Sequence, residues 1–156
     1  MKNEEDIDEI SWRLLEALQE NARLSYAELA RRVGLSPPSV AERMRRLEDI
    51  GVITGYGVRL DRSKLGYALT AFIRLKTPNE NYRRVEALAH SQPEILECHH
   101  VAGEDSFVLK VAAASVKHLD RLILKLAPFG PTTSTIVLGT KVEDKPVTRS
   151  VGDSGR

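Results

Sequence analysis

Residues 24–53 read LSYAELARRVGLSPPSVAERMRRLEDIGVI and contain the signals of two short helices separated by a tight turn. Ser25 can cap the first helix, and Gly34 follows it at a position where a left-handed residue is favoured. Ser36 can cap the second helix, and Pro37 stands in its first turn, where a missing N–H removes no hydrogen bond. The stretch therefore predicts a helix-turn-helix.

The second predicted helix has an apolar stripe on one side and polar residues on the other. Its stripe, at a spacing of four, three and three residues, consists of Val40, Met44, Leu47 and Ile50. The first helix presents to the same core Tyr26, Leu29, Ala30 and Val33. At about 100° per residue, the side opposite the second stripe carries Pro38, Glu42 and Arg45, and one flank carries Ser39, Arg43 and Arg46.

A helix that is held from behind and carries arginines and small polar groups in front can enter the major groove of DNA. Residues 23–47 contain six arginines and two glutamates, a local net charge of +4, although the whole chain carries only +1. The side chains predicted to contact DNA are Arg31, Arg32, Ser36, Pro38, Ser39, Glu42, Arg43, Arg45 and Arg46. The alternative is an ordinary three-helix core with a solvated arginine surface.

Residues 34–56, GLSPPSVAERMRRLEDIGVITGY, resemble the recognition segment of the Lrp/AsnC family, the feast/famine transcriptional regulators. In that family a GLS turn, a proline-bearing second helix, and RRLE followed by G-V-I recur. Residues 7–34 resemble the rest of the family's DNA-binding domain, and the match extends to about Val142. The resemblance implies a homo-oligomer, a dimer or an octamer, that binds double-stranded DNA and responds to an amino acid.

The composition is that of an ordinary globular protein. With 42% hydrophobic residues, the 156-residue chain can form one domain or two small ones. A single cysteine excludes an intramolecular disulfide, and no apolar run approaches the roughly 20 residues that span a bilayer. The N-terminus, MKNEEDIDEI, is acidic and lacks the apolar core of a secretion signal. We therefore expect a cytoplasmic protein with no membrane partner.

The hydrophobic periodicity divides the chain into a helical half and a mixed half, which predicts an α+β protein. Residues 1–53 form the predicted (winged) helix-turn-helix three-helix domain, whose first helix begins near Ile7. Residues 54–66 are expected to form a linker with a short strand. Residues 67–145 have the order strand, helix, strand, strand, helix, strand, which is the ferredoxin-like βαββαβ arrangement. The family resemblance implies that this is an effector and dimerisation domain. Residues 146–156 are expected to form a flexible tail.

The last strand of this second domain is expected from about Thr132 to Val142. Both helices of a ferredoxin-like domain cover the same face of the antiparallel sheet. The opposite face is then expected to be covered by another subunit. A homodimer is therefore the expected minimum.

The hairpin at residues 101–107, VAGEDSF, is the predicted effector site. A glycine hairpin can present backbone N–H groups to a carboxylate, and a nearby aspartate can receive an ammonium group. In the family that the chain resembles, this loop has a glycine followed three residues later by an aspartate; here Ser106 stands at that place, and the carboxylate comes one residue earlier. The predicted contacts to a small amino acid or related metabolite are Val101, Gly103, Asp105 and Ser106. The alternative is a polar hairpin without a ligand.

Cys98, His99 and His100 suggest a metal site, but adjacent side chains of a strand point to opposite faces. Only Cys98 and His100 can converge, and two ligands do not make a zinc site. No nucleophile with a partner base is evident, so we expect no catalytic residue, no metal and no cofactor. Two other readings stay open: an enzyme resembling the sirohaem decarboxylases, in which His99 or His100 has a role, and a nucleoid-architectural protein that binds DNA with little sequence preference.

Overall fold

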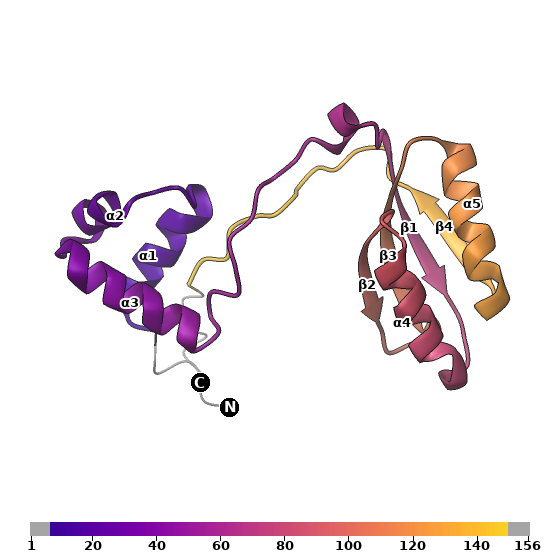
Figure 1. The fold of residues 1–156 in the computed structure, drawn as a ribbon, viewed down its shortest axis with the longest axis horizontal. Coiled ribbons are helices and arrows are strands. Elements are labelled where there is room, and N and C mark those ends of the chain that lie inside the picture. The colour runs from indigo at the N-terminus through magenta and orange to yellow at the C-terminus, as the bar shows by residue number, and fades with distance from the viewer. Residues whose placement is uncertain (1–6, 150–156) are drawn as a thin grey trace, which may run out of the picture. The chain divides into compact units, whose positions relative to one another are not determined.

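The computed structural model describes residues 7–149 of the chain (Figure 1). These residues fall into two compact units, each with its own core. Residues 7–59 and 142–149 form the first unit, and residues 60–141 form the second. The first unit therefore contains two separate segments of the chain. Of the expected flexible tail, residues 150–156 lie outside the described residues.

Three helices form the first unit: α1 (Glu9–Glu20), α2 (Tyr26–Val33) and α3 (Pro37–Asp49). The expected caps are confirmed. The Ser25 hydroxyl accepts a hydrogen bond from the Glu28 N–H, and the Glu28 carboxylate accepts one from the Ser25 N–H, so α2 begins with a capping box. Gly34 ends α2 in the left-handed conformation, with φ of 75°. A helix-turn-helix is therefore present at the predicted position.

The core of the first unit is aliphatic and takes side chains from all three helices. Its buried members are Leu14, Ala17, Leu29, Ala30, Val33, Val40 and Met44. Two residues that were expected to face inward do not: Tyr26 is 46% exposed and Ile50 is 39% exposed. Tyr26 is the first residue of α2, and Ile50 caps the end of α3. The helical period places both residues on the inward side, but residues at the ends of α2 and α3 are not covered by the core.

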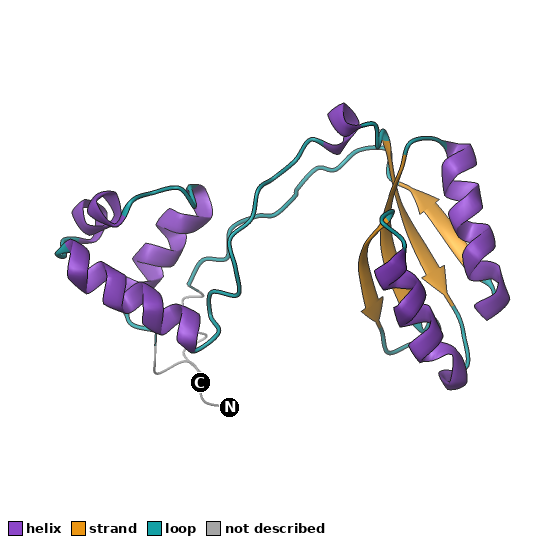
Figure 2. Cartoon of the chain, in the orientation of Figure 1, coloured by secondary structure: helices purple, strands orange, loops and turns teal. Residues whose placement is uncertain are grey.

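The second unit is a four-stranded sheet with two helices (Figures 1 and 2). Its elements in chain order are β1 (Leu69–Leu75), η2 (Asn79–Asn81), α4 (Tyr82–Ser91), β2 (Ile95–His100), β3 (Phe107–Ala113), α5 (Val116–Leu126), η3 (Ala127–Phe129) and β4 (Thr132–Ile136). The strand order is β2-β3-β1-β4, and all neighbouring strands are antiparallel. This is the ferredoxin-like arrangement that the sequence predicts.

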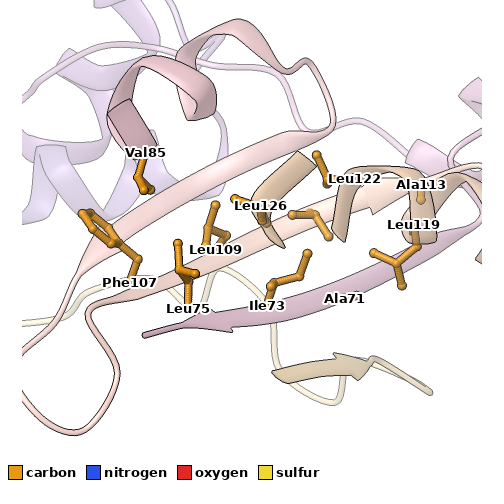
Figure 3. Packing of buried hydrophobic residues seen from close by; sticks show 11 residues of the cluster. Ala71, Ile73, Leu75, Val85, Phe107, Leu109, Ala113, Leu119, Leu122 and Leu126 are labelled. Atoms are coloured by element: carbon orange, nitrogen blue, oxygen red, sulfur yellow. The ribbon is translucent and has the colours of Figure 1, made fainter. Parts of the chain in front are cut away.

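Both helices of the second unit pack on one face of the sheet. Figure 3 shows Ile73 and Leu75 of β1 beside Leu122 and Leu126 of α5, with Val85 of α4 next to Phe107. Along β1 the inward residues are buried, whereas the outward Phe72 is 40% exposed. The outer face of the sheet therefore has no helix of its own to cover it.

Two predicted strand segments differ from the structure. Residues 54–61 form extended backbone without a ladder partner, and a 3-10 helix, η1 (Arg62–Leu65), follows (Figure 2). A strand requires a hydrogen-bonded neighbour, and none is present beside this linker among residues 7–149. β4 ends at Ile136 and does not reach Val142, because β1, its partner, begins at Leu69. In neither segment does apolar alternation alone produce a strand.

No helix between residues 7 and 149 has the length and apolar character needed to cross a membrane.

Candidate nucleic-acid interface and effector loop

The back of α3 is fixed in the core of the first unit, and its front is exposed. Val40, Met44 and Leu47 are each no more than 2% exposed. On the opposite side, Pro38, Glu42 and Arg45 are exposed, as the helical period predicts. Arg45 makes no hydrogen bond or ion pair with any residue that the structure describes. Its guanidinium is therefore available to an external partner.

The Arg43 guanidinium, in contrast, has hydrogen-bond partners within the first unit. Its Nη1 atom donates to the Asp8 carboxylate at 2.6 Å and to the Ser11 hydroxyl at 3.2 Å. At about 100° per residue, Arg43 lies only about 40° from Leu47, at the border of the buried stripe. That position directs its side chain toward α1. Arg43 was expected on the DNA-facing flank, whereas the structure gives it a carboxylate partner inside the same unit.

Asp8 is the N-cap of α1 and is held in its charged form. Its carboxylate accepts a hydrogen bond from the Ser11 backbone N–H at 2.8 Å. This bond, followed by the interactions with the Ser11 and Arg43 side chains, lowers the pKa of Asp8 to about 2. The Asp8–Arg43 pair therefore joins the start of α1 to the middle of α3.

The start of α3 has no spare backbone donor for a phosphate. Pro37 and Pro38 lack an N–H, and the Ser39 N–H donates to the capping Ser36 hydroxyl at 3.4 Å. The hydroxyls of Ser36 and Ser39 lie 2.9 Å apart and bond to each other. Helix N-termini that bind anions through the backbone need free N–H groups. Contacts at this end of α3 must therefore come from side chains.

The remaining predicted arginines flank the front of α3. Arg31 is exposed, and so is Arg46. Arg32 pairs with the Glu20 carboxylate of α1 at 3.1 Å, and its carbonyl oxygen accepts a hydrogen bond from Arg13 at 2.6 Å. Arg32 thus fastens α2 to α1, in the same way that Arg43 fastens α3.

In the predicted effector loop, the hairpin at residues 101–107, Asp105 and Ser106 already have partners within the protein. The Asp105 carboxylate lies 3.8 Å from the Arg74 guanidinium of β1. Ser106 is 9% exposed; its hydroxyl accepts from the Thr77 N–H at 3.1 Å and donates to the Thr77 carbonyl oxygen at 2.8 Å. Val101 donates its N–H to the Ser106 carbonyl oxygen at 3.0 Å, which closes the hairpin around Gly103.

Arg74 and Thr77 are missing from the residues that the sequence singles out, although both contact the hairpin at residues 101–107. The strand pairing explains why: Leu75 stands opposite Phe107 in the β1–β3 ladder, which brings the end of β1 beside the hairpin. The predicted strand order contained this information, since β1 and β3 are neighbours in a ferredoxin-like sheet. The register, which decides the residues involved, was not available from the sequence.

The Cys98–His100 segment follows the strand alternation that was expected. Cys98 is half-buried against the core, and this burial raises the pKa of its thiol. The His100 ring packs edge-on to Tyr82, with 4.7 Å between ring centroids. His99 points away from both and bonds to Glu97 at 3.0 Å. Among residues 7–149, no three histidine, cysteine or acidic side chains gather as they would around a metal ion.

Both halves of the chain match models of known protein domains. The model of a winged helix-turn-helix DNA-binding domain matches residues 7–54, and the model of the Lrp/AsnC ligand binding domain matches residues 70–147. The HTH-type transcriptional regulator LrpA of Mycobacterium tuberculosis is 37% identical over 145 residues, which cover 90% of this chain and 96% of that protein.

Solved structures are similar over nearly the whole chain. The structure of Bacillus subtilis LrpC has a TM-score of 0.83 and 33% identity, covering 88% of this chain and 98% of that one. The feast or famine regulatory protein of M. tuberculosis, complexed with L-methionine, has a TM-score of 0.80 and 35% identity, covering 89% of this chain and 97% of that one. These relatives are named as regulators. The two matched domains and the relatives agree, and the chain belongs to the Lrp/AsnC family of helix-turn-helix transcriptional regulators.

Proposed function

We propose that this regulator binds duplex DNA with α3 in the major groove. The observation that carries the proposal is the division of α3 into a buried back and an exposed front. Val40, Met44 and Leu47 form the back, and the front includes Arg45, which has no hydrogen-bond or ion-pair partner in residues 7–149. A recognition helix needs both properties, because it must keep its orientation while its side chains reach base edges. A solvated helix in an ordinary three-helix core has no such requirement.

Within this proposal the predicted DNA-contacting residues have different roles. Arg45 contacts a base edge, and Pro38 and Glu42 lie beside it on the front of the helix. The Ser36 and Ser39 hydroxyls and the Arg31 and Arg46 guanidinium groups contact phosphates on the flanks. Arg32 and Arg43 mainly hold α2 and α3 against α1, since each has a carboxylate partner within the first unit.

We propose a homodimer as the smallest DNA-binding form. The outer face of the sheet in the second unit is uncovered and includes Phe72, which is 40% exposed. Two-fold symmetry would present two α3 helices to half-sites about 34–36 Å apart on a partly palindromic site. Light scattering with size-exclusion chromatography should give the mass of a dimer or an even multiple. A monomer at micromolar concentration would contradict this part of the proposal.

We propose further that a small amino acid or related metabolite binds at the effector loop and modulates DNA binding. The support comes from the match to the ligand binding domain and from a relative that was solved with L-methionine. In this chain, Asp105 would have to exchange its contact with Arg74 for one with the ligand ammonium group. Calorimetric titration with the common amino acids tests this; no heat and no thermal stabilisation with any of them would contradict it.

The experiment that tests the function as a whole is selection of bound fragments from genomic DNA, with and without added amino acids. A regulator should enrich a limited set of fragments that share a partly palindromic sequence. Uniform recovery of unrelated fragments would instead indicate the nucleoid-architectural alternative. No recovery at all, together with a colour change on adding sirohaem, would favour the enzyme.

A further inference from the structure

The helix α1 carries a second apolar stripe that the three-helix core does not use. Its buried stripe includes Leu14 and Ala17, whereas Leu15 lies about 100° and Trp12 about 160° around the helix from Leu14. This second stripe forms one wall of a groove of about 490 Å³, and residues of the linker, including Ile53 and Tyr56, line the rest. The groove lies entirely within the first unit.

A distant segment of the chain is attached at the rim of this groove. The Gln19 side-chain amide donates to the Val147 carbonyl oxygen at 2.9 Å and accepts from the Val147 N–H at 2.8 Å. The two residues are 128 positions apart in the sequence. The Gln19 amide group thus pairs with the Val147 backbone through one donated and one accepted hydrogen bond, as a backbone residue of an adjacent β-strand would. The Val147 side chain is 66% exposed, so its backbone makes the attachment.

A second contact joins this returning segment to the linker. Arg59 donates to the Asp144 carbonyl oxygen at 3.1 Å, and its Nε atom lies 3.8 Å from the Asp144 carboxylate. Asp144 is the single non-glycine residue with positive φ, 45°, among residues 7–149. Aspartate tolerates this conformation better than most residues, but it still requires support from its neighbours. Arg59 contacts both the backbone and the side chain of this residue.

The linker itself is attached to α3. The Tyr56 hydroxyl donates to the Glu48 carboxylate at 2.7 Å. The two segments that leave the first unit are therefore fixed to different helices, the linker to α3 and the returning segment to α1, and Arg59 and Asp144 join them to each other. A folded unit held by one flexible connection can reorient freely, whereas a second connection removes part of that freedom.

We propose that residues 142–149 are a second tether, which docks on the rim of the α1 groove through Gln19 and limits how the DNA-binding unit reorients relative to the rest of its own chain. The occupant of the rim is this chain's own C-terminal segment. Its effect on DNA binding rests on the proposed function: with the tether docked, the two recognition helices of a dimer lose less freedom when they bind both half-sites, so binding to a complete site is tighter.

The full-length variants Gln19→Leu and Val147→Ala form a matched pair for testing the tether. Gln19→Leu removes both hydrogen bonds and leaves an apolar residue on an apolar stripe, whereas Val147→Ala keeps the backbone groups that make them. We expect Gln19→Leu to increase the hydrogen exchange of the Val147 amide at least tenfold, and Val147→Ala to leave it nearly unchanged. Circular dichroism should show equal helix content in both. Unchanged exchange in a folded Gln19→Leu variant would overturn the tether.

Dilution tests whether the occupant comes from the same chain. Protection of the Val147 amide in the native protein should not depend on protein concentration at a fixed state of assembly. Protection that falls as the protein is diluted to monomers would show that a second copy supplies the segment, which would overturn the proposal as stated.

DNA binding and amide hydrogen exchange together distinguish a failure of the tether from a failure of the proposed function. Gln19→Leu should weaken binding to a two-half-site fragment several-fold and leave binding to a single half-site unchanged. If the native chain binds no DNA while the exchange result holds, the proposed function fails and the tether stands. If the native chain binds DNA and Gln19→Leu leaves both affinities and the exchange unchanged, the tether fails alone.

Discussion

The Arg43 guanidinium lies 2.6 Å from the carboxylate of Asp8, the residue that caps α1. Arg43 is thus a contact between helices, while Arg45, two residues further on, is exposed and has no hydrogen-bond or ion-pair partner in residues 7–149. The cationic surface of α3 is narrower than its composition suggests. Under the proposed function, stability and DNA recognition therefore depend on different arginines of the same helix.

The Asp8–Arg43 contact should be measurable as a coupling in the stability of the first unit. Asp8→Ala should cost about 0.5–2 kcal/mol, because it also removes the helix cap. Since the two side chains are 53% and 32% exposed, the coupling energy in a double-mutant cycle should be only about 0.2–1 kcal/mol. Urea unfolding of Asp8→Ala, Arg43→Ala and the double variant gives the value. Strictly additive effects would mean that the pair contributes nothing.

Acid should remove the contribution of Asp8. Its pKa is lowered from 3.8 to about 2 in the folded protein. The stabilisation is therefore complete above the unfolded pKa of 3.8 and is lost as the pH falls through about 2. The native protein should lose more stability over this range than Asp8→Asn, which has no charge to lose. Equal losses, measured by urea midpoints at several pH values, would contradict this role.

Gly130→Ala should destabilise the second unit strongly. A Cβ atom at this position would lie 2.1 Å from the Lys76 carbonyl oxygen, and φ is 150°. Overpacking against backbone typically costs about 1–3 kcal/mol, and the strained φ adds to it. Gly139→Ala is the matched control, because nothing lies within 4 Å of its added Cβ. The midpoint of thermal unfolding should fall clearly for Gly130→Ala and hardly at all for Gly139→Ala. Equal midpoints for the two variants would contradict the close packing of Gly130 against the Lys76 carbonyl oxygen.

Ser106→Ala should destabilise the second unit although it removes a single oxygen atom. The buried hydroxyl satisfies both the N–H and the carbonyl oxygen of Thr77. Leaving a buried donor without an acceptor costs about 1–3 kcal/mol. Ser134→Ala on the exposed β4 changes the same atoms without burying an unpaired group. If both variants unfold at the same denaturant concentration as the native protein, Ser106 has no structural role.

The sequence predicted the elements of both units because the local signals agreed with each other. Ser25, Gly34 and Ser36 specify helix ends through short-range hydrogen bonds and backbone conformation, which need no tertiary information. The alternation in β1 likewise follows from one buried and one open face. The ferredoxin-like order follows from such segments taken together.

Contacts between distant residues could not be predicted in the same way. Arg43 and Asp8 are 35 positions apart, and Gln19 and Val147 are 128 positions apart. A helical period places Arg43 on a flank but does not reveal that a carboxylate of α1 lies beside it. The linker strand was expected from apolar alternation, yet strand formation depends on a neighbour that the alternation does not identify. Side-chain pairing and register are properties of the folded arrangement.

The central claim is that the front of α3 reads DNA, and the most direct measurement compares Arg45→Ala with Arg83→Ala in equilibrium binding to the selected DNA site. Arg83 is exposed on α4 in the second unit and serves as a charge-matched control. Arg45→Ala should weaken binding by about 1–3 kcal/mol and relax the sequence preference, while Arg83→Ala binds like the native protein. If Arg45→Ala keeps the native affinity, sequence preference and salt dependence, α3 does not face the DNA.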